Sequence, residues 1–393
     1  MDATLCSDLR AELPVTARYC YLNHAAIAPL PRRSIDRVAA LALTVGSTGD
    51  RRFPDRNRAY EEVRSLAARL LGARAAHEVA FVENTSSGLS LVAQGLDWRR
   101  GDNVVGAGGE FPSNAYPWMQ LADRGVEYRT VPERDGRIDA GELLGRIDGR
   151  TRAVAISWVE YASGFRFDLG RIGAVCRERG ALFVVDVIQG LGALALDVER
   201  DGVDVACGAA HKWLLGPEGI GLLYVSDRVV ERLRPARSGW RSMRDMENWT
   251  DLAIDWAPGA PRYESGTLNG FGIVALGGSL ELLLAAGPTA VESRVLALAE
   301  RAARGLAEFG FDVVSSRRPG ETSGIVAATH RRLPAAALVE RLAERGVITA
   351  ARAGRLRVSP HAYNTEDEID RLLAELRTAL AGRPSGSPAL ASR

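Results

Sequence analysis

Lys212 is the residue whose type most clearly indicates chemistry, because it is the only lysine in the chain. Lys and Arg together number 50, so the other 49 basic residues are arginine. Only an ammonium group can lose its proton in a dry pocket and attack a carbonyl as a free amine. Small residues precede it in ACGAAHKWLLGPEGIG, which lets a bulky ligand approach the backbone. A chance surface lysine is the alternative, and the pattern favours a nucleophilic amine.

Asp186 is a second candidate, since it follows the apolar run ALFVV, and Gln189 comes three residues later. A carboxylate at the end of a buried strand is costly unless it meets a cation. A protonated pyridine nitrogen would be such a cation. A lysine imine with an acidic partner for the pyridinium is typical of pyridoxal 5'-phosphate (PLP) enzymes. A helix N-cap is the alternative explanation for Asp186.

Ser86 and Ser87 could bind the phosphate of such a cofactor. The strand-like EVAFVE ends in Asn-Thr-Ser-Ser-Gly, and the helix-like LSLVAQGL follows. Hydroxyls and backbone amides at a helix N-terminus form an anion site. Helix capping alone would also explain Ser and Thr there.

The composition argues against several partners and enzyme classes. The chain has 393 residues, enough for two to three domains, with 50 basic against 49 acidic residues. We therefore expect no nucleic-acid partner. No apolar run approaches the roughly 20 residues of a membrane span. We expect no signal peptide, because the start MDATLCSDLRAELP carries acids where a signal peptide needs basic residues and then an apolar core. Four scattered cysteines without a C-x-x-C pair suit a reducing compartment, so we expect a cytoplasmic protein without a metal site. The only lysine lies between His211 and Trp213, so the sequence contains no Gly-Lys-Ser/Thr phosphate loop.

Strand-like and helix-like segments alternate through the middle of the chain. This rhythm predicts an α/β fold with a mostly parallel sheet between helices, whose ligand lies at the C-terminal ends of the strands. Parallel strands are predicted at 78–82, 103–107, 153–159 and 181–185, with a helix at 168–180 that begins at an acid and ends at glycine.

The C-terminal third is predicted to be a smaller α+β domain after an irregular loop at 240–263. Its predicted helices are 272–286, 288–309, 334–345 and 365–380, and its strands are 312–314 and 324–328. The predicted boundaries are 1–20 for an N-terminal segment packing near the small domain, 21–270 for the large PLP-binding domain, 271–382 for the small domain, and 383–393 for a disordered tail.

These motifs together resemble the class V aminotransferase / cysteine desulfurase family of PLP enzymes, which has fold type I. The resemblance rests on YLNHAA, DVIQ, HKWLLGPEGIGLLYV, ESGTLNGFG and RVSPHAYNTEDEID, in order over about residues 21–380. It implies a homodimer with shared active sites.

The resemblance also implies roles for individual residues. Lys212 would form the Schiff base with PLP and move the proton at the substrate's Cα. Asp186 would hold the pyridine nitrogen protonated, and Gln189 would bind the phenolic oxygen. Ser86, Ser87 and His211 would bind the phosphate, and Thr267 would reach it from the partner subunit. Arg357 would hold the α-carboxylate of the amino-acid substrate in a bidentate pair, with Arg355 as the competing choice.

Departures from the family pattern bear on the reaction. The segment Phe111-Pro112-Ser113-Asn114 replaces the stacking histidine of desulfurases and is similar to kynureninases, so Phe111 would cover the ring and Asn114 would border the substrate. Tyr161 could be an acid or base near the substrate, or could serve packing. His24 could add polarity beside the substrate, or could lie in a surface turn.

No cysteine follows Cys207, whereas desulfurases need a thiol near the carboxylate-binding arginine. This absence points to the isopenicillin epimerase-like / C–S lyase-like branch. The favoured function is a C–S β-lyase acting on an S-substituted cysteine in secondary metabolism, ahead of class V transamination and then amino-acid epimerisation. A PLP-binding protein without turnover is the non-enzyme alternative.

Overall fold

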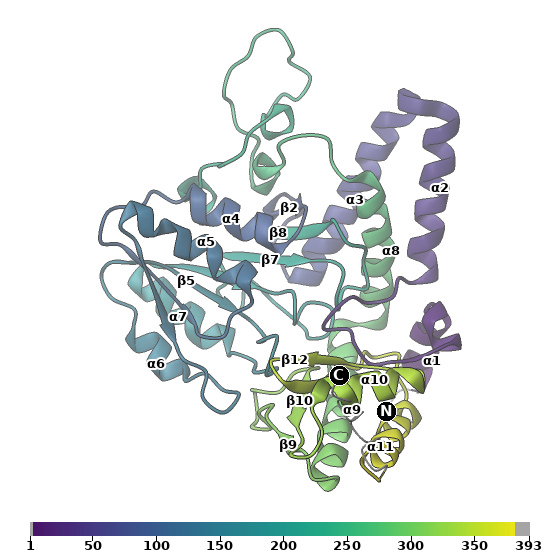
Figure 1. Cartoon of the computed structure of the whole chain (residues 1–393). Helices are drawn as coiled ribbons and strands as arrows, with labels where there is room; N and C mark the ends of the chain where they lie inside the picture. The colour runs from purple at the N-terminus through teal and green to yellow at the C-terminus, as the bar shows by residue number, and fades with distance from the viewer. Residues whose placement is uncertain (1–2, 382–393) are drawn as a thin grey trace, which may run out of the picture.

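A seven-stranded sheet forms the centre of the computed structural model, which describes residues 3–381 (Figure 1). The strand order is β2-β8-β7-β6-β5-β3-β4. The bounds are β2 Val79–Val82, β3 Asn103–Ala107, β4 Glu127–Val131, β5 Thr151–Ser157, β6 Leu182–Asp186, β7 Val205–Ala209 and β8 Gly221–Val225. The strands predicted at 78–82, 103–107, 153–159 and 181–185 are therefore present as β2, β3, β5 and β6.

The sheet is mixed and mostly parallel, as predicted, but one strand runs against the prediction. The pairs among β4, β3, β5, β6 and β7 are parallel, whereas β7–β8 and β8–β2 are antiparallel. The expectation that 78–82 is a parallel strand is thus wrong. Core side chains cover both faces of β2, so its sequence is continuously apolar, like that of a parallel strand.

Helices cover both faces of the sheet, because alternate residues of each strand point to opposite sides. On β5, Val154 and Ile156 pack in one core and Ala153 and Ala155 in the other. The first core includes residues of α3 Phe53–Leu71, α6 Ala140–Gly145, α7 Leu169–Arg179 and α8 Gly270–Ala286, and the second includes residues of α4 Thr85–Gly95 and α5 Tyr116–Met119. Figure 1 shows these two helical layers.

The predicted helix at 168–180 is confirmed as α7, and its ends follow from its sequence. The Asp168 side chain accepts a hydrogen bond from the Arg171 amide, which caps the N-terminus. Gly180 ends the helix with a φ of 71°, in the left-handed region that glycine adopts at low cost.

A smaller sheet and three helices form the C-terminal part. Its sheet has the order β12-β13-β10-β9. The bounds are α9 Pro288–Glu308, β9 Asp312–Val313, β10 Val326–Thr329, α10 Ala335–Glu344, β11 Val347–Ile348, β12 Ala350–Arg352, β13 Arg355–Val358 and α11 Glu366–Ala381. The predicted helices and strands of this region are confirmed, and 240–263 is irregular apart from two short 3-10 turns, Trp240–Ser242 and Ala260–Tyr263.

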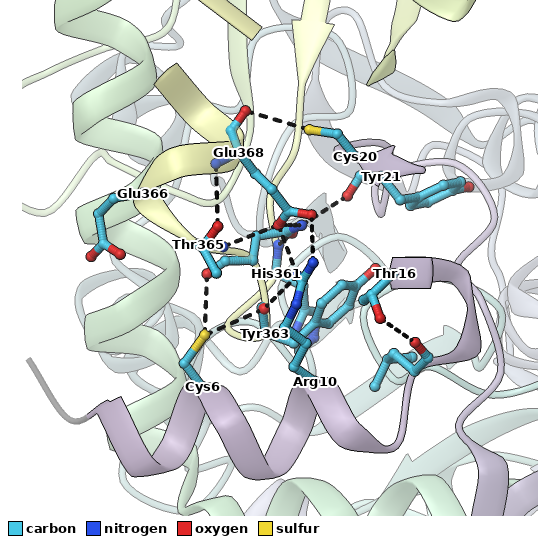
Figure 2. Close-up of polar contacts among 12 residues, drawn as sticks. Cys6, Arg10, Thr16, Cys20, Tyr21, His361, Tyr363, Thr365, Glu366 and Glu368 are labelled. Atoms are coloured by element: carbon cyan, nitrogen blue, oxygen red, sulfur yellow. Dashed lines mark hydrogen bonds and ion pairs between the residues drawn. The ribbon is translucent and has the colours of Figure 1, made fainter. Parts of the chain in front are cut away.

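The N-terminal segment packs against the C-terminal part (Figure 2). Arg10 of α1 Ala3–Ala11 forms an ion pair with Glu368 of α11 at 3.1 Å, and the Cys6 thiol donates to the Tyr363 carbonyl. Strand β1 Cys20–Tyr21 pairs with β11. The domain boundaries stay a prediction, since α8 packs on α3 and on α2 Arg32–Thr48; the tail 383–393 lies outside the described residues.

Within residues 3–381, no single helix is long and apolar enough to cross a membrane. Helices α8 and α9 reach that length and composition only as a pair, across a bend of 84°.

Candidate active site

Lys212 lies in the turn that follows β7, in the middle of the large sheet. The Leu215 amide donates to the Lys212 carbonyl at 2.9 Å and closes the turn. Leu215 has a φ of 55°, a conformation that a bulky residue adopts only under strain. The turn is therefore held in a shape that its own sequence does not favour.

Burial makes the Lys212 amine unusually easy to deprotonate. Loss of solvation lowers its pKa from 10.5 to about 8, and the nearby charges of Arg357 and Arg352 act in the same direction. The Asp186 carboxylate opposes this shift. A lysine with such a pKa is partly a free amine near neutral pH, as a nucleophile or base requires.

Asp186 ends β6 and is 2% exposed. Burial raises its pKa to about 6, while a hydrogen bond from the Ile188 amide and the charge of Lys212 oppose that rise. The helix N-cap alternative does not apply, because no helix follows Asp186 before β7. The carboxylate is thus positioned for a cationic partner on the Lys212 side of the strand end.

The N-terminal segment packs against the lysine turn and is hydrogen-bonded to it. The Ala28 amide donates to the His211 carbonyl at 2.8 Å. The Gln189 side chain donates to the Ala25 carbonyl at 3.1 Å and accepts from the Trp213 indole at 3.0 Å. One amide hydrogen of Gln189 remains available for a ligand.

A chain of contacts links Lys212 to Arg357. The Lys212 Nζ lies 5.6 Å from the centroid of the Phe111 ring. The Phe111 ring meets the Tyr161 ring edge-on at 5.3 Å, and the Arg357 Nη1 donates to the Tyr161 carbonyl at 3.0 Å. The structure thus brings together four residues that the sequence places far apart.

Arg357 is a buried guanidinium with open hydrogen-bond donors. It is 1% exposed, and neither its Nε nor its Nη2 has a partner within residues 3–381. The competing Arg355 is already paired with Glu133 at 2.9 Å. Because a buried cation without an anion is costly, the geometry favours Arg357 over Arg355 for a carboxylate ligand.

The start of α4 presents hydroxyls and amides to solvent. The Asn84 side chain accepts from the Ser87 amide at 2.9 Å, so Asn84 is the N-cap. Ser86 is exposed, and its hydroxyl is 2.7 Å from that of Ser113, two residues after Phe111. This helix N-terminus therefore adjoins the segment that covers Lys212.

His24 and Asn114 are enclosed by protein. His24 is fully buried, with its ring nitrogens bonded to the Ser359 carbonyl and the Tyr363 hydroxyl. The surface-turn alternative for His24 is therefore wrong. Asn114 is also fully buried, and its side-chain oxygen accepts from the Trp118 indole. These contacts favour supporting roles, and their proposed contact with substrate stays a prediction.

Thr267 lies apart from Lys212, in the loop before α8. It is exposed and lines a cavity with Val82, Gly219 and Arg237. No hydrogen bond within residues 3–381 joins it to the lysine, and a role in a neighbouring subunit's site stays a prediction.

Sequence reasoning missed two acids beside the site, the half-buried Glu110 and the buried Glu160. The Glu110 carboxylate accepts from the Ser157 amide at 2.6 Å and from its hydroxyl. Glu160 is 1% exposed, and within residues 3–381 neither of its carboxylate oxygens has a hydrogen-bond partner. Burial raises the pKa of Glu110 to about 8, against the bonds from Ser157. Burial also raises the pKa of Glu160, helped by the charge of Glu110. The available signal was their place directly before Phe111 and Tyr161.

The arrangement fits PLP in its chemistry. The reactive amine suits the aldehyde of PLP, and the buried carboxylate suits its pyridinium nitrogen. The aromatic ring over the amine suits the flat cofactor ring, and the capped helix N-terminus suits the phosphate.

Comparisons with known proteins agree with this fit. The family model for aminotransferase class-V matches residues 20–372. A probable cysteine desulfurase of Methanothermobacter thermautotrophicus is 29% identical, over 95% of this chain and 98% of the relative. An apo cysteine desulfurase from Thermococcus onnurineus shares the fold, with a TM-score of 0.86 at 24% identity over 95% of this chain and 97% of that one. The cystine C–S lyase C-DES, solved with its product cysteine persulfide, matches at a TM-score of 0.84 and 25% identity over 93% and 98%. Another structure of C-DES has glycine covalently linked to its PLP cofactor.

Proposed function

The chain belongs to the aminotransferase class-V family, and from this membership we propose that it is a C–S β-lyase acting on an S-substituted cysteine. Whatever its specific reaction, the chain is a PLP-dependent enzyme that acts on an amino acid. When bound, PLP supplies a ring that accepts the electron pair left at the substrate's Cα.

The residues that would hold the cofactor are those at the strand ends. Lys212 would attach it, Asp186 would keep its ring nitrogen protonated, and Phe111 would lie on its face. Gln189 would donate to its phenolic oxygen. Ser86, Ser87 and His211, with Thr267 of a second subunit, would bind its phosphate.

The chain's own groups would then perform a β-elimination. The two open donor atoms of Arg357 bind the α-carboxylate and fix the Cα–H bond relative to Lys212. The Lys212 amine, whose pKa is lowered to about 8, takes the Cα proton. The Cβ–S bond breaks, and the thiolate leaves and receives a proton, for which the Tyr161 hydroxyl is the candidate donor. Hydrolysis of the remaining three-carbon fragment gives pyruvate and ammonia.

The single observation that favours a lyase over a desulfurase is the burial of every cysteine. Cys6, Cys20, Cys176 and Cys207 are all buried, and burial raises the pKa of Cys207 well above its usual value. The Cys207 thiol lies against the Thr85 carbonyl under α4. A buried thiol of raised pKa is a poor sulfur acceptor, so sulfur would leave with the product.

Steady-state product analysis of the holoenzyme tests the proposal. With S-substituted cysteines and no keto acid, we expect continuous release of pyruvate and ammonia, which Lys212→Ala abolishes. A single turnover that leaves the cofactor in its amine form would instead make the enzyme a transaminase. Inverted substrate without either product would make it an epimerase.

A further inference from the structure

Three arginines share one face of the β12–β13 hairpin. The strands pair antiparallel, with Arg352 opposite Arg355 and Ala350 opposite Arg357. Residues directly opposite each other in a sheet, and residues two apart along a strand, lie on the same face. Arg352, Arg355 and Arg357 therefore present their side chains to the same side, where Arg357 meets the Tyr161 carbonyl after β5.

The hairpin turn fixes this arrangement. Its two central residues, Ala353 and Gly354, have φ values of 48° and 74°, as in the tight two-residue turns that match the twist of paired strands. Alanine adopts this conformation only at a cost. The short turn holds Arg352 and Arg355 as a fixed pair at the hairpin end, and Figure 1 shows β12 on the side of the C-terminal part nearest the large sheet.

The charges on this face do not balance. Arg355 is neutralised by Glu133 at 2.9 Å. Arg352 donates only to the carbonyl of its neighbour Ala351, and Arg357 only to the Tyr161 carbonyl, within the described chain. Among the described residues, Arg352 and Arg357 therefore have no carboxylate partner, and the charges of both act on Lys212. Their mutual repulsion lowers the pKa of Arg357, after the larger effect of burial.

We propose that Arg352 is a second anion subsite, which binds a negatively charged group at the far end of the substrate side chain while Arg357 binds the α-carboxylate. The inference rests on the proposed function for the assignment of Arg357. It narrows the substrate to an amino acid with a second anionic group, such as an S-substituted cysteine that carries a carboxylate beyond the sulfur. An exposed guanidinium forms such a pair without the desolvation cost that a buried one pays.

Binding of simple acids tests the subsite without any turnover. Titration calorimetry of the holoenzyme compares glutarate with valerate, which has the same chain length and a single carboxylate. We expect glutarate to bind about tenfold more tightly, Arg352→Gln to remove this preference without weakening valerate, and Arg352→Lys to retain part of it. Arg331→Gln, which removes another exposed guanidinium elsewhere, is the control and should change the affinity for neither acid. Equal weakening of both acids in Arg352→Gln would place Arg352 on the α-carboxylate and overturn the proposal, as would the absence of any preference in the wild type.

A matched substrate pair then separates this inference from the proposed function. S-carboxymethyl-cysteine and S-carbamidomethyl-cysteine differ by one charge at nearly constant shape. The second subsite predicts a higher kcat/KM for the charged member, lost in Arg352→Gln. If glutarate binding shows the preference but neither cysteine releases pyruvate, the subsite stands and the lyase assignment fails. If both cysteines are cleaved equally and glutarate shows no preference, the lyase stands and the subsite fails.

Discussion

Opposing effects at a single residue set the reactivity of Lys212. Burial, followed by the charges of Arg357 and Arg352, favours the neutral amine, whereas the Asp186 carboxylate favours the ammonium form. Because the net effect lowers the pKa to about 8, the amine is available for a carbonyl at a pH where an exposed lysine is almost fully protonated.

Removing the carboxylate should shift this balance further. In Asp186→Asn, the charge that raises the lysine pKa is gone, so the Lys212 pKa falls below that of the wild type. The rate at which apoprotein reacts with PLP, followed by absorbance between about pH 6 and 10, should rise with pH to a plateau in both proteins, with a lower midpoint in the variant. Glu178→Gln, at an exposed position of α7, is the control. An unchanged midpoint in Asp186→Asn would contradict the assignment.

At the residue scale, the sequence predicted the residues that are chemically distinctive and missed those defined by their surroundings. A single lysine and an acid after an apolar strand are visible in one dimension. The family motif favoured Arg357 over Arg355, but the physical reason is not visible there, because Arg355 is paired with Glu133, more than 200 positions away. Nor does a sequence show that the His24 ring is enclosed between Ser359 and Tyr363.

The N-terminus of α4 is brought to the site by a close approach of two elements. Gly88 on α4 faces Cys207 on β7, and a Cβ at residue 88 would lie 2.2 Å from the Cys207 sulfur. Only glycine lets the helix pack this closely, so the sulfur and the glycine together fix the distance between the helix and the strand that leads to Lys212.

Gly88→Ala should therefore displace α4 and weaken cofactor retention. Overpacking of this kind costs about 1–3 kcal/mol of unfolding free energy, measurable by urea denaturation. The atom that a Cβ at residue 88 would overlap is the Cys207 sulfur, so Cys207→Ala in the Gly88→Ala background should restore most of the lost unfolding free energy. If the double variant is no more stable than Gly88→Ala alone, Cys207 is not what excludes a side chain at residue 88.

Strand positions were predictable at the element scale, but strand direction was not. The apolar run of β2 gives no sign that it pairs antiparallel with β8 at the sheet edge. The small-residue segment before Lys212 was not among the predicted strands, yet it forms strand β7 up to Ala209. Alanine and glycine are weak strand formers, and this strand is defined by its pairing with the neighbouring strands and its packing against α4.

For the molecule as a whole, two buried histidines behind the lysine turn link stability to pH. His361 is fully buried and bonded to the Trp213 carbonyl. Burial lowers its pKa from 6.5 to about 4. Between pH 4 and 6.5 the unfolded chain therefore binds more protons than the folded chain. The stability that the neutral His361 contributes is complete above pH 6.5 and is lost as the pH falls towards 4.

His361→Gln should flatten that dependence. Relative to the variant, the wild type should lose ~3 kcal/mol of unfolding free energy between those two pH values. Urea unfolding at several pH values measures the difference, and subtraction of the variant removes the opposite contribution of Glu110, whose pKa is raised to about 8. The same substitution at the partly exposed His330 is the control and should keep the wild-type slope. Parallel curves for wild type and His361→Gln would show that this histidine is not held neutral.

The proposed shared active site makes a prediction for the assembly. If Thr267 serves the site of a second subunit, a dimer of one Lys212→Ala chain and one Thr267→Val chain has one site with both defects and one with neither. Random mixing after dissociation yields half mixed dimers, so about a quarter of wild-type activity should return from two defective proteins. If Thr267 acts on the lysine of its own chain, every site keeps one defect and mixing restores nothing.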